Sequence, residues 1–246
     1  EKIENWEEDM DRLLLTLPLC GTSFKKVYFN DHKQKISIDL VQPDDIIVNY
    51  WAKSLTEARR VTQRFYLYHN ELVSRQRDGK YVNDEDDPIP LPGSKMESET
   101  KNTLQGKQGA DNDPMDSPHE MYEVHTYYDM DEDGYEEPWI FTIEKDSRKL
   151  VRAVPNFDYK SIRKNGKGEV VEIKPKEYFV KYGFIPSPDG GFYDVGFGLL
   201  LGPINESVNT IVNQLIDSGT LSNLQSGFIG KGLRIKMGES KFTPGE

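Results

Sequence analysis

The sequence predicts an α+β fold in which short strands and short helices alternate before a longer helix near the C-terminus. Apolar and polar residues alternate over residues 36–40, as in a half-buried strand, whereas apolar residues recur at helical spacing over 203–218. The apolar runs are short, so the sequence offers no candidate transmembrane helix and we expect no membrane partner.

The composition limits the classes of function that the chain can have. Its 246 residues carry a formal net charge of −11, with Cys20 as the single cysteine. Tight binding to phosphates needs clustered Lys and Arg, so the whole surface is not expected to grip nucleic acid. DNA could still slide past such a protein without sticking. One cysteine excludes an intrachain disulfide and a cysteine-based zinc site.

Residues 1–83 form the first predicted part, with mixed α and β elements. An amphipathic helix over 3–17 should end at Pro18 and Gly21. The alternation that follows predicts a hairpin with its turn at 30–33, and further strands at 46–48 and 64–68.

Two short helices are also expected in this part. Ser54 and Glu57 have the spacing of a capping box, which predicts a short helix through Arg59. Asn70 can cap a second helix, which Gly79 should end.

The rest of the chain divides by composition. Residues 84–119 are acidic and almost free of aliphatic side chains, so we expect a flexible linker or loop. A β-rich part over 120–200 should contain strands at 121–128, 139–144, 149–157 and 169–173. A helix within 201–221 should begin with Pro203 at its first position and end near Ser218 at Gly219. The last part, 222–246, should contain a Gly-punctuated strand or hairpin over 227–237.

The sharpest local motif is an acidic loop over residues 129–137. Oxygen ligands at alternate positions and a glycine that permits a tight turn are typical of a calcium loop, so a Ca²⁺ or Mg²⁺ site is one hypothesis. The EF-hand form is excluded because its twelfth position is Ile140, and a solvated acidic turn is the alternative. The candidate ligands are Asp129, Asp131, Asp133 and Glu137.

No enzyme is predicted and no catalytic residue is assigned. The phosphate-binding loop, the serine nucleophile elbow and the zinc-protease histidine motif are all absent. Two alternatives remain: a metal-dependent hydrolase that uses the acids of 129–137, and a calcium-stabilised binding module on a virion surface.

The second informative stretch is 182–230, which contains no Lys, Arg or His. Its helix could pack inside the domain with a polar seam, or against copies of itself around an axis. In the second case it would present neutral or acidic groups to DNA. The candidate channel or interface residues are Ile204, Asn205, Val208, Asn209, Ile211, Val212, Asn213 and Leu215, and the candidate phosphate contacts are Lys231, Arg234 and Lys236.

Five stretches in one order carry a resemblance to a known family. The chain resembles portal proteins, the head-to-tail connectors of short-tailed double-stranded DNA phages, and residues 185–237 are the most specific part. The stretches are GTSFKKVYFND, QPDDIIVNYWAKSLTEARRVTQRFYLY, YDMDEDGYEEPWIFTIEKDSRKLVR, IPSPDGGFYDVGFGLLLGPINESVNTIVNQLIDSGTLSN and GFIGKGLRIKMG.

The resemblance implies a structural subunit of a ring of twelve copies at one capsid vertex, assembled in the host cytoplasm and retained in the virion. Double-stranded DNA would pass through non-specifically, and the partners would be terminase, tail adaptors, and capsid and scaffolding proteins. It also implies a wing made by the α+β and β-rich parts, a stem helix over 203–218, and a clip that starts at 227–237. Because the chain starts within a predicted helix and stops within the predicted clip, a fragment of a longer protein is expected.

Overall fold

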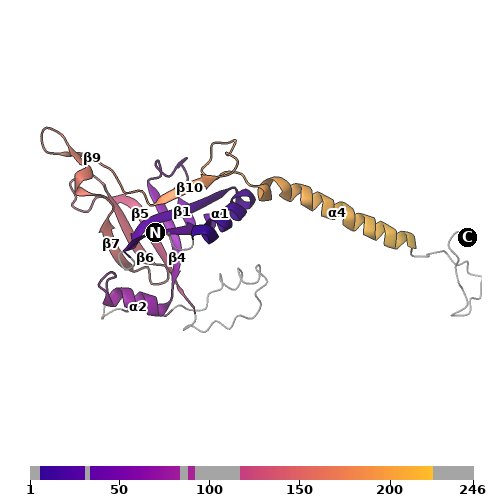
Figure 1. The fold of residues 1–246 in the computed structure, drawn as a ribbon, viewed down its shortest axis with the longest axis horizontal. Helices are drawn as coiled ribbons and strands as arrows, with labels where there is room; N and C mark the ends of the chain where they lie inside the picture. Colours follow the sequence, from indigo (N-terminus) through magenta and orange to yellow (C-terminus); the bar gives the residue numbers. More distant parts are fainter. Residues whose placement is uncertain (1–5, 31–33, 84–87, 92–116, 224–246) are drawn as a thin grey trace, which may run out of the picture. The chain divides into compact units, whose positions relative to one another are not determined.

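The computed structural model describes residues 6–30, 34–83, 88–91 and 117–223. Residues 1–196 form one compact unit and 197–246 a second, and each is described by itself. The predicted α+β class is confirmed, because antiparallel sheets are combined with helices and a helix lies near the C-terminus (Figure 1). Most of the predicted linker over 84–119 and the whole predicted clip over 227–237 lie outside the described residues.

A three-stranded antiparallel sheet of order β10-β1-β2 forms one layer of the first unit. The predicted hairpin is its β1–β2 pair, and α1 lies alongside this hairpin (Figure 1). Leu13 is the buried residue of α1. The elements are α1 (Trp6–Cys20), β1 (Thr22–Asn30), β2 (Lys35–Val41) and β10 (Phe179–Gly183).

A five-stranded antiparallel sheet of order β3-β4-β5-β6-β7 forms the second layer. Strand β6 alternates half-buried and buried side chains along its whole length, which is the pattern of a strand with one face on a core. Its strands are β3 (Ile46–Val48), β4 (Arg60–Leu67), β5 (His119–Tyr128), β6 (Glu137–Glu144) and β7 (Leu150–Pro155).

The remaining elements of the first unit are small. They are the 3-10 turns η1 (Pro43–Asp45) and η2 (Tyr159–Ser161), helix α2 (His69–Arg77), and the two-stranded sheet of β8 (Ile162–Lys164) and β9 (Val170–Ile173). The second unit contains α4 (Phe197–Asn223).

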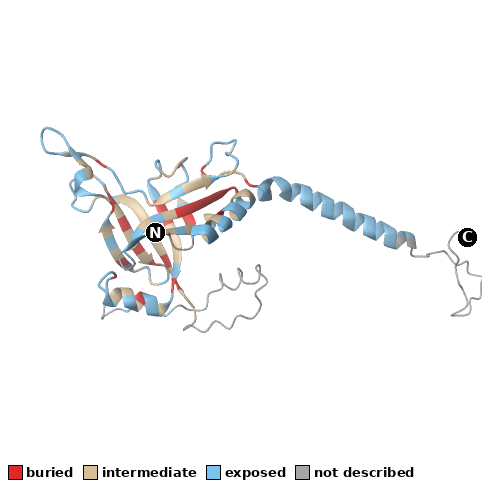
Figure 2. Ribbon diagram, in the orientation of Figure 1, coloured by how far each residue is buried: buried red, intermediate tan, exposed pale blue. Residues whose placement is uncertain are grey.

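Two apolar clusters hold the first unit together (Figure 2). One joins the two sheets and is made of Phe24, Val41, Ile46, Val61 and Phe192. The other packs α2 on the five-stranded sheet and is made of Leu67, Leu72, Tyr81, Met121 and Val151. Full burial of one such side chain contributes roughly 1.5–3 kcal/mol, so the first unit has a substantial apolar core of its own.

A half-buried polar network joins the two sheets beside the first cluster. Lys26 Nζ on β1 donates to Glu123 Oε1 on β5 at 2.7 Å and to Gln63 Oε1 on β4 at 2.9 Å. His125 Nε2 donates to the same Glu123 oxygen at 2.8 Å. Burial alone would raise the pKa of Glu123, but the His125 hydrogen bond and the Lys26 charge hold it at about 2. Glu123 is therefore a carboxylate at neutral pH.

A close backbone contact joins the end of α1 to residues 194–196, which precede α4 in the sequence. Gly21 ends α1 with a φ of +87°, and its N–H donates to the Leu17 carbonyl at 2.8 Å. A Cβ built on Gly21 would collide with the backbone of Asp194 and Gly196, and one on Gly196 would collide with Leu19 and Gly21. Neither position can therefore carry a side chain without moving backbone.

Hydrogen bonds and an ion pair hold the segment that leads to this contact. The Asp194 N–H donates to Thr22 Oγ1 at 2.7 Å, and the Phe184 N–H donates to the Gly21 carbonyl at 2.9 Å. The Asp194 carboxylate pairs with Lys181 on β10 at 2.8 Å. Residues 184–196 are thereby fastened to the three-stranded sheet.

Two predictions on helices in the first unit were wrong in detail. Helix α1 continues through Pro18 to Cys20, because a proline in the last turn removes only one backbone donor. The Ser54 box forms its hydrogen bond, from the Glu57 N–H to Ser54 Oγ at 3.2 Å, but no helix follows. Leu55 and Ala58 instead pack on the inter-sheet cluster from a turn, so tertiary packing outweighs the local signal.

Helix α2 is confirmed, but its N-terminal cap lies two residues earlier than predicted. Its N-terminal cap is Tyr68 rather than Asn70, and the Glu71 carboxylate accepts a hydrogen bond from the Tyr68 N–H at 3.2 Å. Gly79 follows its end with a φ of +69°, in agreement with the predicted stop.

Replacing Gly21 tests the backbone contact. Gly21→Ala should lower the free energy of unfolding by more than about 3 kcal/mol, because the new Cβ adds a backbone collision to left-handed strain. Gly79→Ala is the matched control, since its φ is also positive but a Cβ there meets open space. It should cost about 1 kcal/mol. Urea unfolding measures both, and equal losses would contradict the contact.

The Glu123 network predicts a specific loss of stability in acid. A carboxyl whose pKa falls from 4.5 to about 2 on folding stabilises the fold above pH 4.5, on the order of 3 kcal/mol, and that contribution is lost as the pH falls toward 2. Glu123→Gln should remove most of this pH dependence. Glu172→Gln breaks only an exposed pair with Arg163 and should leave it intact. Unfolding free energies measured from pH 6 to pH 2.5 distinguish the two variants.

Candidate subunit interface and acidic loop

Helix α4 spans Phe197–Asn223, about 40 Å at 1.5 Å per residue. The prediction that it starts at Pro203 and ends near Ser218 was wrong at both ends. Pro203 lies inside the helix, where it lacks the N–H that would bond the Leu199 carbonyl, and Gly219 lies within the last turns. The described side chains of α4 are exposed along its length (Figure 2).

One side of α4 carries a continuous row of apolar side chains, here called the apolar stripe. At 3.6 residues per turn its members fall within about half of the helix circumference. They are between 45% and 66% exposed, and no other described residue of the second unit covers them. The stripe consists of Phe197, Leu200, Leu201, Ile204, Val208, Ile211, Val212, Leu215 and Ile216.

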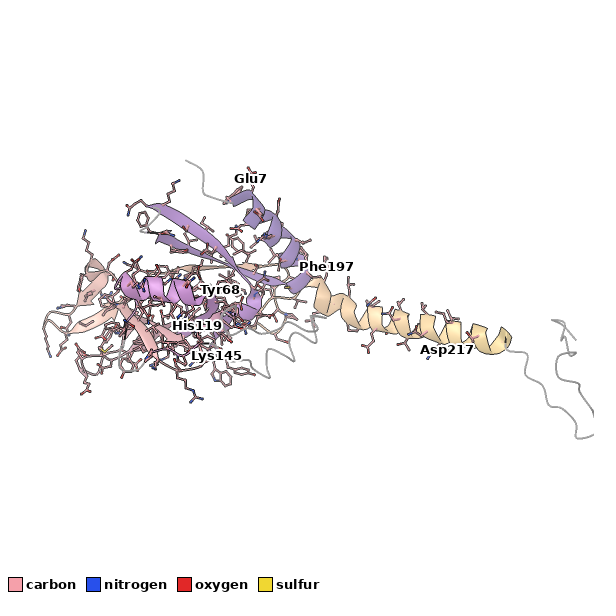
Figure 3. The ribbon with its side chains drawn as sticks, turned by 90° about the horizontal axis from the view of Figure 1, so that it is seen from below. Glu7, Tyr68, His119, Lys145, Phe197 and Asp217 are labelled. Carbon is pink, nitrogen blue, oxygen red and sulfur yellow. The ribbon has the colours of Figure 1, made fainter. Side chains whose placement is uncertain are left out.

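The side of α4 opposite the stripe is acidic or neutral. Glu206 and Asp217 are the acids of the helix, and their separation of eleven positions makes close to three full turns, so both face away from the stripe. The Asp217 side chain extends from the helix surface (Figure 3). No Lys, Arg or His occurs on this helix, so phosphate finds no cation along it.

The predicted interface residues occupy two parts of this surface. Five of the eight, Ile204, Val208, Ile211, Val212 and Leu215, belong to the apolar stripe. The three asparagines recur every four residues and therefore drift around the helix: Asn205 borders the stripe, whereas Asn213 lies close to the acidic side. Lys231, Arg234 and Lys236 lie outside the described residues.

The acidic loop joins β5 to β6, and the structure brings three of its four predicted ligands together. One carboxylate oxygen from each of Asp129, Asp131 and Asp133 lies within 4.8 Å of the others. Gly134 takes a φ of +90°, and its N–H donates to Asp129 Oδ2 at 2.9 Å. The turn therefore converges the aspartates as the alternating spacing predicts.

Glu137 has different contacts from the three aspartates. Its Oε2 accepts hydrogen bonds from the Met130 N–H at 3.5 Å and from Trp139 Nε1 at 3.4 Å. It begins β6 and is not in the aspartate cluster of the described residues. Asp129 Oδ1 is buried and has no hydrogen-bond partner. This leaves an acceptor inside the loop that a cation could use.

No sequence pattern predicted the buried polar residues of the five-stranded sheet. His119, Thr142 and Glu144 are each at most 1% exposed, although polar residues in an alternating strand predict a solvent-facing side. Only the register of β5 on β6 places them on the core face. Strand β10 was also not predicted, because its five residues lack a clear alternation.

Comparison with known proteins identifies a family for most of the chain. The model of the family described as Phage SU10 portal protein matches residues 22–225. No curated protein matches the chain. Among the described residues, no helix combines the length and the apolar character that a membrane crossing needs.

Calcium should stabilise the fold if the acidic loop holds a cation. For a site with a Kd on the order of 0.1 mM, 1 mM Ca²⁺ would add about 1.4 kcal/mol and raise Tm by a few degrees. Asp131→Ala should abolish this shift, and Asp189→Ala, which removes an exposed acid outside the loop, should not. Thermal unfolding with Ca²⁺ or with EDTA measures it. An unchanged Tm in the unsubstituted protein would show that the loop is a solvated turn.

Proposed function

The chain belongs to the phage portal protein family, and from this premise we propose that it is one subunit of the ring through which double-stranded DNA enters and leaves the capsid. Portal proteins are structural components of the phage virion that assemble as oligomeric rings. The observation that supports the proposal at the level of single residues is the exposed apolar stripe of α4.

The stripe supports packing of α4 against neighbouring subunits. Nine apolar side chains in one row are too many for a helix that stays in water, and their burial would contribute roughly 25 cal/mol for each Å² removed from solvent. A ring supplies this cover, because each copy has a neighbour on both sides. In this arrangement α4 is the stem helix, and we propose the family's ring of twelve copies.

The opposite side of α4 suits passage of DNA. A channel that must let a duplex slide needs weak, non-specific contact, and cations on its wall would bind phosphate in a salt-dependent manner. Glu206, Asp217 and the neighbouring Asn213 supply a surface without cations. We therefore assign this side of the helix to the channel, and the apolar stripe to the contacts between subunits.

The other parts of the proposal follow from the role of the ring. Terminase would dock on it during packaging, tail adaptors would replace terminase afterwards, and capsid and scaffolding proteins would surround it during assembly in the host cytoplasm. We assign no catalysis to the chain. The conversion of ATP energy into DNA movement would belong to terminase.

Placing a charge on the stripe tests the assignment. Ile211→Asp in the full-length protein should prevent or strongly weaken ring formation, because a carboxylate buried between apolar helices loses several kcal/mol of hydration. Thr210→Asp adds the same charge at the next position, on the other side of the helix, and should leave assembly intact. Native mass spectrometry and negative-stain electron microscopy report the oligomer.

Complete rings of Ile211→Asp, or equal loss of rings in both variants, would contradict the stripe as the subunit contact. Circular dichroism of each variant, compared with the unsubstituted protein, reports whether the total helical content is retained. Absence of rings from the unsubstituted full-length protein would contradict the portal role itself.

A further inference from the structure

A buried polar cluster lies where α2 meets the first residue of β5. His119 and Glu144 are 0% and 1% exposed, whereas His69, at the start of α2, is half-buried. His69 Nδ1 lies 3.2 Å from His119 Nε2, and this hydrogen bond joins α2 to β5. Figure 3 labels His119 together with Tyr68, which caps α2.

The second nitrogen of His119 faces a carboxylate. Its Nδ1 lies 4.0 Å from Glu144 Oε1 on β6, and neither atom has a hydrogen-bond partner. The other oxygen of Glu144 is well satisfied, because Oε2 accepts from both the N–H and the Oγ of Ser147 at 2.6 Å. Glu144 is thus held in place by the turn after β6, and His119 is held between it and His69.

The charge state of His119 depends on few groups. Burial is the main effect and lowers its pKa; Glu144 on β6 opposes this, and His69 on α2 adds to it. A neutral His119 fits the cluster, because one ring nitrogen can point an N–H toward Glu144 while the other accepts from His69. A proton on Nε2 would turn this acceptor into a donor and place a cation in a site without water.

We propose that the His69–His119 contact is an acid-sensitive fastening, which holds the start of α2 on β5 while His119 is neutral and releases it when His119 is protonated. The contact joins two elements that are otherwise connected through the apolar cluster around Leu72. Release would expose the His119 ring to water, which can solvate its charge. The stem helix and the inter-sheet network are not involved.

The direction and the size of the effect follow from linkage. A histidine whose pKa is lowered in the closed form binds fewer protons closed than open, so acid favours the open form. The contact has its full stability at pH values above the ordinary histidine pKa of about 6.5. Its stability decreases as the pH falls below that value. The ratio of open to closed can rise by up to roughly tenfold for each pH unit below that value.

Hydrogen exchange of the α2 amides measures this opening. Between pH 7.0 and 5.5, protection factors corrected for intrinsic exchange should fall by up to roughly tenfold in Leu72–Gln76, and those of Phe24 on β1 should stay constant. His119→Gln should remove the acid dependence. His125→Gln is the control, since it removes a half-buried histidine that contacts Glu123 instead of α2, and this variant should keep the acid dependence.

Each result decides the proposal. Constant α2 protection in the unsubstituted protein, or an unchanged acid response in His119→Gln, would overturn it. If His119→Gln does not fold, the ring proton shifts of His119 in the unsubstituted protein give the answer by NMR. A titration midpoint below about 6.5 that coincides with loss of α2 protection supports the fastening, whereas a midpoint at or above that value refutes it.

Discussion

The apolar stripe of α4 needs cover from water, and no other described residue of the second unit covers it. This constraint distinguishes the two units: the first buries apolar side chains within itself, and the described part of the second does not. Residues 1–196 bury two apolar clusters of their own. Helix α4 has no buried side chain among those described, so its long-term exposure to water would favour association. This exposure supports the proposed association of copies through α4.

The first unit is built so that the segment leading to α4 is fixed. Two glycines allow the end of α1 to touch the backbone of residues 194–196, and Lys181 and Thr22 hold Asp194 beside them. The three-stranded sheet that carries these contacts is joined to the five-stranded sheet by the Phe24 cluster and by Lys26 and Glu123.

Local patterns predicted most of the elements, and long-range contacts account for those they did not predict. Alternation located β2, and the regularly spaced Asp129, Asp131 and Asp133 lie in a turn that brings their three carboxylates together. The Ser54 box failed because Leu55 and Ala58 pack on the core from a turn, an effect that propensity does not contain. The start of α4 was missed because Pro203 is a frequent first residue of helices, yet here it follows six helical residues.

The candidate sites show the same division between local and long-range information. The stripe could be predicted because helical periodicity depends only on the sequence, and Ile204, Val208, Ile211 and Leu215 follow it. The pairing of His69 with His119 could not be predicted from the sequence. The two residues are fifty positions apart, and only the β4–β5 register brings them together. Family resemblance over the ordered stretches supplied the portal identification, which the match over residues 22–225 confirms.

The central claim is that neighbouring subunits cover the apolar stripe and leave the acidic side of α4 to the channel. Hydroxyl-radical footprinting of the assembled full-length ring, with the dissociated subunit as reference, tests it directly. The account predicts strong protection of Leu201, Val208 and Leu215 in the ring, and continued modification of residues near Glu206 and Asp217. Equal modification of the stripe in both states, or protection restricted to the acidic side, would contradict it.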